Sequence, residues 1–125
     1  MKEEKSLKMK LKRLNKYHNK KTTINGITFD SKLEAKRFQE LKLLERAKEI
    51  SDLELQPSFE LQPSFKKNGK TIRAITYKAD FKYFDNGSRR IIVEDTKGMK
   101  TKDYILKKKL FEYKFPELTI NEIKR

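Results

Sequence analysis

The stretch Thr71–Gly98, TIRAITYKADFKYFDNGSRRIIVEDTKG, decides the fold that this sequence can form. The dipeptide Asn86-Gly87 lies between two β-rich runs and predicts a β-hairpin, because both turn residues tolerate a positive φ. Alternation along the first arm predicts one aromatic face and leaves Asp80 on the other face. The residues of the predicted aromatic face are Arg73, Ile75, Tyr77, Ala79, Phe81 and Tyr83.

The length of the turn sets which residues of the two arms lie opposite each other. A two-residue loop pairs Asp85 with Ser88 and therefore places Asp80 opposite Val93. Asp95 then lies diagonally across from Asp80 on the same face, with the two backbones roughly 7–8 Å apart. A longer loop that keeps the same parity preserves this shared face.

Two carboxylates on one face suggest a metal site, because hard cations such as Mg²⁺ take oxygen ligands from more than one segment. Lys97 has the same parity as Asp95 and projects to the same side, where an ammonium can position a water or neutralise a phosphate. Glu94 has the opposite parity, so the spacing to Lys97 selects Asp95 as the second carboxylate.

A helix is predicted upstream of the hairpin, because Ser31 and Glu34 form a capping box before a periodic run that ends near Ile50. On a helical wheel, Glu34 lies in the middle of the apolar face with Phe38 and Leu41. Glu34 can be the capping partner alone. We favour a place in the metal site, because a buried carboxylate costs several kcal/mol unless it is paired or bound to metal.

The pattern of Asp80, a hairpin and then Asp95-x-Lys97 resembles the catalytic signature of the PD-(D/E)xK restriction-endonuclease-like superfamily. The segments GITFDSKLEA, YKADFKYF and IIVEDTKG look like small phage-encoded members of it, which are similar to Holliday-junction resolvases and TnsA-type endonucleases. The resemblance covers roughly residues 26–115. Ala79 stands where the signature has proline, a common departure in this superfamily.

The resemblance implies an α/β fold with a restriction-endonuclease-like core, in which a mixed central β-sheet is flanked by helices. The order of the predicted elements favours an α/β fold independently. The implied activity is that of a Mg²⁺- or Mn²⁺-dependent DNA endonuclease that acts on branched DNA as a homodimer. The implied catalytic residues are Glu34, Asp80, Asp95 and Lys97, and the implied metal ligands are Asp80, Asp95, Glu34 and the Thr96 carbonyl.

The composition excludes several other chemistries. The chain of 125 residues fits one modest domain, and its net charge of +14 favours a nucleic-acid partner. Cysteine is absent and His18 is the only histidine, so thiolate catalysis and zinc or paired-histidine sites lack their ligands. No glycine-rich phosphate loop and no apolar run of membrane-spanning length is present. We expect a cytoplasmic protein, located in the host cytoplasm if it is phage-encoded.

Basic residues gather at two places outside the hairpin. Residues 1–21 hold nine Lys/Arg and two Glu, and we expect residues 1–25 to form a basic arm before a nuclease domain at residues 26–125. A second group lies on a helix expected over residues 101–113. The candidate DNA contacts are Lys8, Lys12, Arg13, Lys100, Lys102, Lys107 and Lys108. A solubilising arm and a solvated basic helix face remain alternatives.

An identical hexapeptide, ELQPSF, occurs at Glu54–Phe59 and again at Glu60–Phe65. Each copy predicts a short extended segment that proline confines to a sheet edge or a bend. We expect the first core strand over residues 52–65, a turn at residues 66–70 and a final strand over residues 118–123.

A non-catalytic basic DNA-binding protein is the alternative function. In that interpretation Asp80 and Asp95 are ordinary sheet residues or ion-pair partners of Lys78 and Lys97. Carboxylates on a surface that a polyanion approaches repel phosphate unless a cation bridges them. This argument favours the nuclease.

Overall fold

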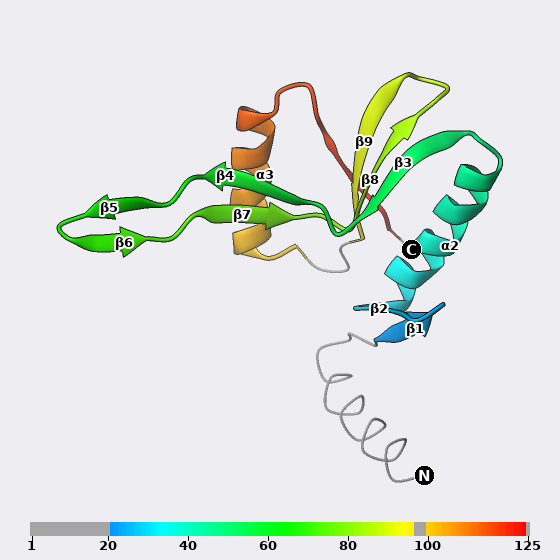
Figure 1. Cartoon of the computed structure of the whole chain (residues 1–125), viewed down its shortest axis with the longest axis horizontal. Coiled ribbons are helices and arrows are strands. Elements are labelled where there is room, and N and C mark those ends of the chain that lie inside the picture. The colour runs from blue at the N-terminus through cyan, green and yellow to red at the C-terminus, as the bar shows by residue number, and fades with distance from the viewer. Residues whose placement is uncertain (1–20, 97–99, 125) are drawn as a thin grey trace, which may run out of the picture. The chain divides into compact units, whose positions relative to one another are not determined.

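The computed structural model describes residues 21–96 and 100–124 of the chain (Figure 1). The chain divides into two compact units, residues 1–42 and residues 43–125. The expected boundary between a basic arm (residues 1–25) and a nuclease domain (residues 26–125) stays a prediction. The turn of the first hairpin spans that boundary. No helix in the described ranges is long and apolar enough to cross a membrane.

The first unit contains a small hairpin and most of a helix. Strands β1 (Thr22–Ile24) and β2 (Ile27–Phe29) pair through a two-residue turn, in which Asn25 has φ 53° and Gly26 has φ 79°. Helix α2 (Lys32–Arg46) follows. Its buried residues are Glu34, Ala35, Phe38 and Leu41, so the predicted apolar face with a carboxylate at its centre is confirmed.

Both ends of α2 have a local cause. At its start, the N–H of Glu34 donates to Oγ of Ser31 at 3.1 Å, which is the predicted cap. At its end, Lys48 adopts φ 62° and the N–H of Glu49 donates to the carbonyl of Leu44, which closes the helix. The helix therefore stops before the predicted end at residue 50.

The second unit is built on a four-stranded sheet in the order β10-β9-β8-β3. The strands are β3 (Ile50–Leu55), β8 (Phe81–Asp85), β9 (Arg90–Asp95) and β10 (Ile120–Glu122). Strand β10 is parallel to β9, whereas the other two pairings are antiparallel. The prediction of an α/β protein with a mixed sheet is confirmed.

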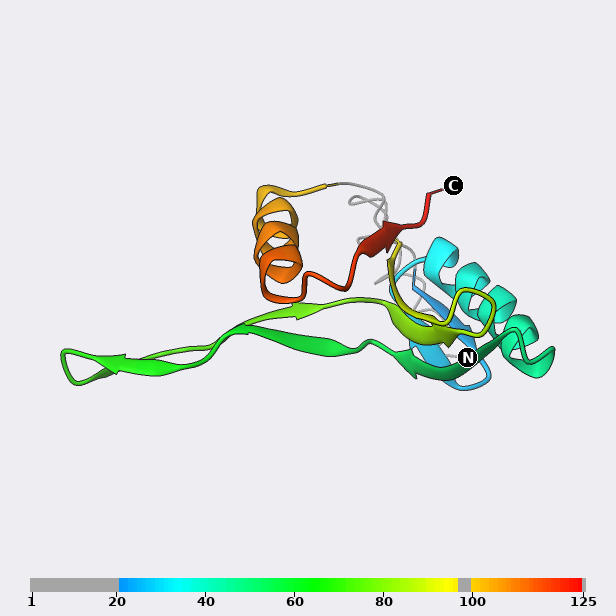
Figure 2. The same cartoon turned by 90° about the horizontal axis from the view of Figure 1, so that it is seen from above.

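A two-stranded ribbon extends away from this sheet (Figure 2). Its inner part pairs β4 (Ser58–Gln62) with β7 (Ile75–Lys78), and its outer part pairs β5 (Phe65–Lys67) with β6 (Lys70–Ile72). The two hexapeptide copies supply the breaks, because Pro57 lies between β3 and β4 and Pro63 lies between β4 and β5. The predicted single strand over residues 52–65 is thus wrong, and the predicted bends at proline are confirmed.

Helix α3 (Lys102–Lys114) packs on β4 and β7 and closes the core of this unit. Thr101 caps it, accepting a hydrogen bond from the N–H of Tyr104 at 3.1 Å. The ring of Phe111 lies edge-on to the ring of Phe59, with centroids 4.9 Å apart. The buried residues of this core are Tyr77, Ala79, Val93, Tyr104, Phe111 and Ile120.

The turn between β8 and β9 differs from the predicted two-residue loop. Asp85 pairs with Arg90, so the loop holds four residues, and Arg89 has the left-handed φ of 58°. The carboxylate of Asp85 accepts hydrogen bonds from both the N–H and the hydroxyl of Ser88. The side chain of Asn86 donates to the carbonyl of Lys48, so local and tertiary hydrogen bonds hold the longer loop.

The predicted continuous aromatic face is also wrong. The chain between Tyr77 and Tyr83 is not one strand, because β7 pairs with β4 whereas β8 pairs with β3 and β9. Tyr77 packs in the core with Val93 of β9. The hydroxyl of Tyr83 donates at 2.5 Å to Glu94, which follows Val93 on the same strand. Because successive residues of a strand face opposite ways, the two tyrosines lie on opposite faces of the sheet.

Candidate metal centre

Asp80 lies where the chain leaves the ribbon and enters the sheet. The preceding N–H, that of Ala79, donates to the carbonyl of Pro57, whereas the N–H of Asp80 donates to the carbonyl of Glu94. The carbonyl of Asp80 accepts from the N–H of Gln56, which has φ 51°. Backbone hydrogen bonds on both sides therefore fix the position of this carboxylate.

Asp80 and Asp95 come together at the end of the β8–β9 hairpin. Phe81 pairs with Glu94, and the N–H of Asp80 donates to the carbonyl of the same residue, so Asp80 and Phe81 both lie opposite Glu94. The strand bulges at Asp80, and the register of the hairpin does not pair Asp80 with Asp95. The predicted pairing of Asp80 with Val93 is wrong, because Val93 pairs with Lys82. The predicted shared face of Asp80 and Asp95 stays a prediction.

Thr96 holds the Asp80 carboxylate through two hydrogen bonds. Its N–H donates to Oδ2 of Asp80 at 2.7 Å, and its hydroxyl donates to the same oxygen at 2.6 Å. Within the described residues, the second oxygen, Oδ1 of Asp80, accepts no hydrogen bond. Asp80 is half-buried, so this oxygen belongs to the more accessible of the two carboxylates.

Asp95 is 1% exposed, and the expectation that both carboxylates face the surface is wrong for it. Its Oδ2 accepts a hydrogen bond from the hydroxyl of Tyr77, which is itself buried in the core. Burial, followed by the hydrogen bond and charge of Asp95, raises the pKa of Tyr77, so that its hydroxyl stays protonated and donates.

A third carboxylate continues the row across the sheet. Glu122 on β10 pairs with Asp95 on β9, and the hydroxyl of Tyr104 donates to Oε2 of Glu122 at 2.8 Å. That hydrogen bond, with the ammonium groups of Lys100 and Lys108, lowers the pKa of Glu122. Glu122 is therefore ionised at neutral pH and is balanced by these neighbours.

Three of the four lysines expected to contact DNA near and on α3 form ion pairs within the protein. Nζ of Lys100 lies 3.1 Å from Glu122, and Nζ of Lys108 lies 3.7 Å from it. Lys107 lies 3.5 Å from Asp103, one helical turn away, and Lys102 is exposed. Exposed pairs of this kind contribute roughly 0–1 kcal/mol, so they leave the lysines able to exchange partners.

The remaining candidate residues lie in the first unit or outside the described residues. Glu34 belongs to the first unit, where its Oε2 accepts from the N–H of Asp30 at 3.3 Å, and its place in the metal site stays a prediction. Lys97 lies outside the described residues. The same holds for Lys8, Lys12 and Arg13.

The donor set can be compared with what a metal needs. Among the residues that the structure describes, no group of three or more Asp, Glu or His side chains is arranged to hold a metal ion. Mg²⁺ keeps several waters and binds through one or two carboxylates, so Asp80 and Asp95 are sufficient in number and hard in character. By chemical type the two aspartates suit a largely hydrated Mg²⁺, and their binding of this ion stays a prediction.

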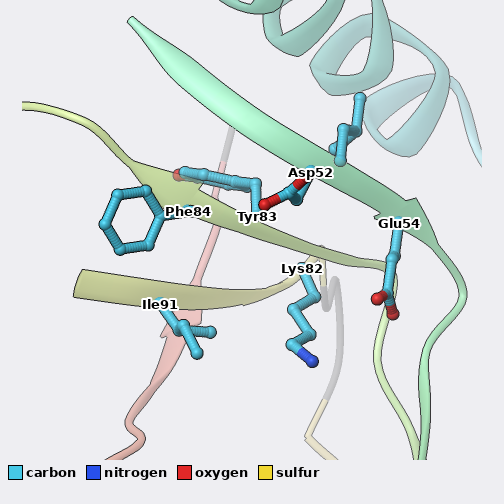
Figure 3. Close-up of a pocket in the computed structure, with 7 residues that line it drawn as sticks. Asp52, Glu54, Lys82, Tyr83, Phe84 and Ile91 are labelled. Atoms are coloured by element: carbon cyan, nitrogen blue, oxygen red, sulfur yellow. The ribbon is translucent and has the colours of Figure 1, made fainter. Parts of the chain in front are cut away.

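An open pocket lies on the same sheet, beside the bulge in β3 where Asp52 has φ 56°. Figure 3 shows Lys82, Glu54 and Ile91 pointing to the same side of the strands. The residues that line this pocket include neither Asp80 nor Asp95. The pocket is therefore distinct from the carboxylate cluster.

Sequence reasoning missed three members of the cluster, Tyr77, Tyr104 and Glu122. Tyr77 was assigned to an aromatic face by alternation, and the strand break at Ala79 and Asp80 removed that basis. Tyr104 and Glu122 meet across the fold, and no local pattern encodes that contact. Thr96 was expected to act through its carbonyl, whereas its N–H and hydroxyl hold Asp80.

The fold and this cluster define a mixed α/β protein with the carboxylates of Asp80 and Asp95 near one end of its sheet. Residues 14–125 match the family described as Protein of unknown function (DUF1064), and the chain belongs to that family. No curated protein and no solved structure matches the sequence.

Proposed function

We propose that this protein is a Mg²⁺-dependent DNA endonuclease that cuts branched DNA as a homodimer. The observation that carries the proposal is the position of Asp80 beside Asp95 at the end of the β8–β9 hairpin, where Asp80 is hydrogen-bonded to Glu94 and Thr96, the two neighbours of Asp95. The net charge of +14 supports a polyanionic substrate.

Each residue of the cluster has a distinct task in the proposed reaction. Asp80 and Asp95 would hold the cation, Mg²⁺ or Mn²⁺, which when bound would polarise the scissile phosphate and make a water more acidic. Thr96 fixes the rotamer of Asp80, and Tyr77 holds Asp95 by donating to it.

Lys97 follows Thr96 in the sequence and is proposed to position the attacking water and to stabilise charge at the phosphate. Glu34 is proposed to bind the metal directly or through a water. Both roles rest on the resemblance to the PD-(D/E)xK superfamily.

The homodimer is supported by an exposed apolar stripe on α3. Leu106, Leu110 and Tyr113 follow one another at helical spacing and are 58%, 36% and 88% exposed. A twofold dimer with one site per chain can cut two strands symmetrically, which a resolvase must do.

The test is a cleavage assay of the purified protein with Mg²⁺ or Mn²⁺ on linear, nicked, flapped and four-way DNA. We expect metal-dependent cleavage that is fastest on the four-way substrate. Binding without cleavage in either metal would favour the alternative, a non-catalytic DNA-binding protein.

A further inference from the structure

The outer part of the ribbon is exposed along its whole length. Every residue from 62 to 74 is exposed, and β5 and β6 pair with each other beyond the elements that pack on α3 (Figures 1 and 2). An isolated two-stranded ribbon is only marginally stable in water. Core packing therefore does not account for the side chains at the tip.

The tip of the ribbon carries positive charge and no carboxylate. Residues 61–79 contain no Asp or Glu and hold Lys66, Lys67, Lys70, Arg73 and Lys78. Lys67 and Lys70 lie directly opposite each other in the register of β5 and β6. Like charges in that position destabilise a strand pair, and a bound polyanion relieves the repulsion.

An apolar pair lies beside these lysines. Phe65 pairs with Ile72, and the two side chains are 44% and 40% exposed. They lie on the same face as Lys67 and Lys70, because residues two apart on a strand share a face. Lys66 lies on the opposite face, so both faces of the ribbon carry basic side chains.

Basic side chains on both faces of the ribbon favour a partner with a groove over a partner with a flat anionic surface. A ribbon inside a nucleic-acid groove meets phosphates on two walls, whereas a ribbon that lies on an anionic membrane meets charge on one face. The major groove of B-DNA is about 12 Å wide and admits a two-stranded β-ribbon. Its thymine methyl groups and base edges give apolar side chains a partner.

We propose that the tip of this ribbon enters the major groove of duplex DNA, with Lys66, Lys67 and Lys70 on phosphates and with Phe65 and Ile72 against base edges. The inference rests on the proposed function only in taking DNA as the partner. It does not depend on catalysis, because binding is measured without metal.

The test compares DNA binding by the double variant Lys67→Gln/Lys70→Gln with binding by Lys32→Gln/Lys36→Gln, which removes two exposed lysines from α2. Fluorescence anisotropy with a 20-base-pair duplex in EDTA gives Kd over a range of salt. Each lost phosphate contact lowers the slope of log K against log salt by about 0.9, so the ribbon variant should lose about 2 and the control less than 1. The variant Phe65→Ser/Ile72→Ser should weaken binding about tenfold with an unchanged slope.

Equal affinities and slopes for the ribbon variant and the parent would overturn the inference. So would a loss of binding to phosphatidylserine vesicles with unchanged DNA binding, since that outcome assigns the tip to a membrane. A parent that binds duplex through the ribbon but cuts no DNA refutes the nuclease and leaves the inference standing. A parent that cuts DNA with Mg²⁺ while the ribbon variant binds normally refutes the inference alone.

Discussion

Thr96 donates two hydrogen bonds, one from its N–H and one from its hydroxyl, to a single carboxylate oxygen of Asp80, at 2.7 and 2.6 Å. The contact joins the end of β9 to the point where the chain passes from ribbon to sheet. It occupies one oxygen of Asp80 and holds the side chain in one orientation. In the proposed metal site, Asp80 would therefore need no reordering when a cation binds.

Replacing Asp80 by Asn should remove cleavage and keep the fold. The amide oxygen can still accept from Thr96, but the charge that holds Mg²⁺ is lost. Partners of metal ligands alone contribute 10- to 100-fold, so we expect the rate to fall by more than about 100-fold. Single-turnover cleavage measures the rate, and anisotropy without metal should show equal or tighter DNA binding.

The matched control is Asp52→Asn, which makes the same chemical change at an exposed residue of β3. Its cleavage rate should equal that of the parent. Parental activity in both Asp80→Asn and Asp95→Asn would contradict the nuclease assignment.

Replacing Tyr77 by Phe should destabilise the protein. The change leaves the buried carboxyl group of Asp95 without the hydroxyl that donates to it, and losing the hydrogen-bond partner of a buried polar group costs about 1–3 kcal/mol. The free energy of unfolding in urea measures this loss. The control Tyr113→Phe alters a side chain that is 88% exposed and should change stability by less than about 0.5 kcal/mol. Equal stabilities of the two variants would exclude a structural role for the Tyr77 hydroxyl.

Stability should fall in acid partly through Glu122. The hydrogen bond from Tyr104, and then Lys100 and Lys108, lower the pKa of this carboxyl below its ordinary value of 4.5. A pKa lowered in the folded state stabilises the fold above pH 4.5, and that contribution is lost as the pH falls through the folded value. Glu122→Gln should therefore be less stable than the parent at pH 7, with the difference shrinking below about pH 4.5. A difference that stays constant from pH 7 to pH 3 would contradict this account.

The sequence predicted the helices better than the strand partners, for a physical reason. Caps and apolar periodicity are local, so Ser31 and Thr101 mark the starts of α2 and α3 within a residue. Two Asn-Gly pairs, at residues 25–26 and 68–69, form turns with both residues at positive φ, whereas Asn86-Gly87 does not. The difference lies in contacts from Ser88 and Lys48, which a dipeptide rule does not contain.

The loop gained an even number of residues, so residues 81–85 kept the predicted parity against β9. That agreement ends at Asp80, because its N–H bonds to the carbonyl of Glu94, which already pairs with Phe81. Neither this bulge nor the switch of strand partners at Asp80 could be predicted, since alternation in sequence continues through it. Tyr77 and Glu122 join the site only through that switch and through the parallel pairing of β10 with β9.

Deleting residues 1–21 tests the proposed basic arm. If Lys8, Lys12 and Arg13 contact phosphates, the slope of log K against log salt should fall by about 3, because each contact contributes about 0.9. Cleavage at low salt should persist, because the arm supplies counterion release and no chemistry. The full chain with these three residues changed to Gln should match the deletion, and an unchanged slope in both would exclude the arm as a DNA contact.

Glu34 can be tested for catalysis separately from helix capping. Ser31→Ala removes the side-chain oxygen that accepts from the N–H of Glu34 and should cost about 1 kcal/mol of stability without altering the rate of bound substrate. Glu34→Gln keeps an oxygen that can accept from the N–H of Asp30, so its effect on capping should be smaller. If Glu34 binds the metal directly or through a water, the cleavage rate of Glu34→Gln at saturating DNA should fall about 10- to 100-fold and recover partly at higher Mg²⁺. A Glu34→Gln variant with the parental rate at every Mg²⁺ concentration would confine Glu34 to the helix start.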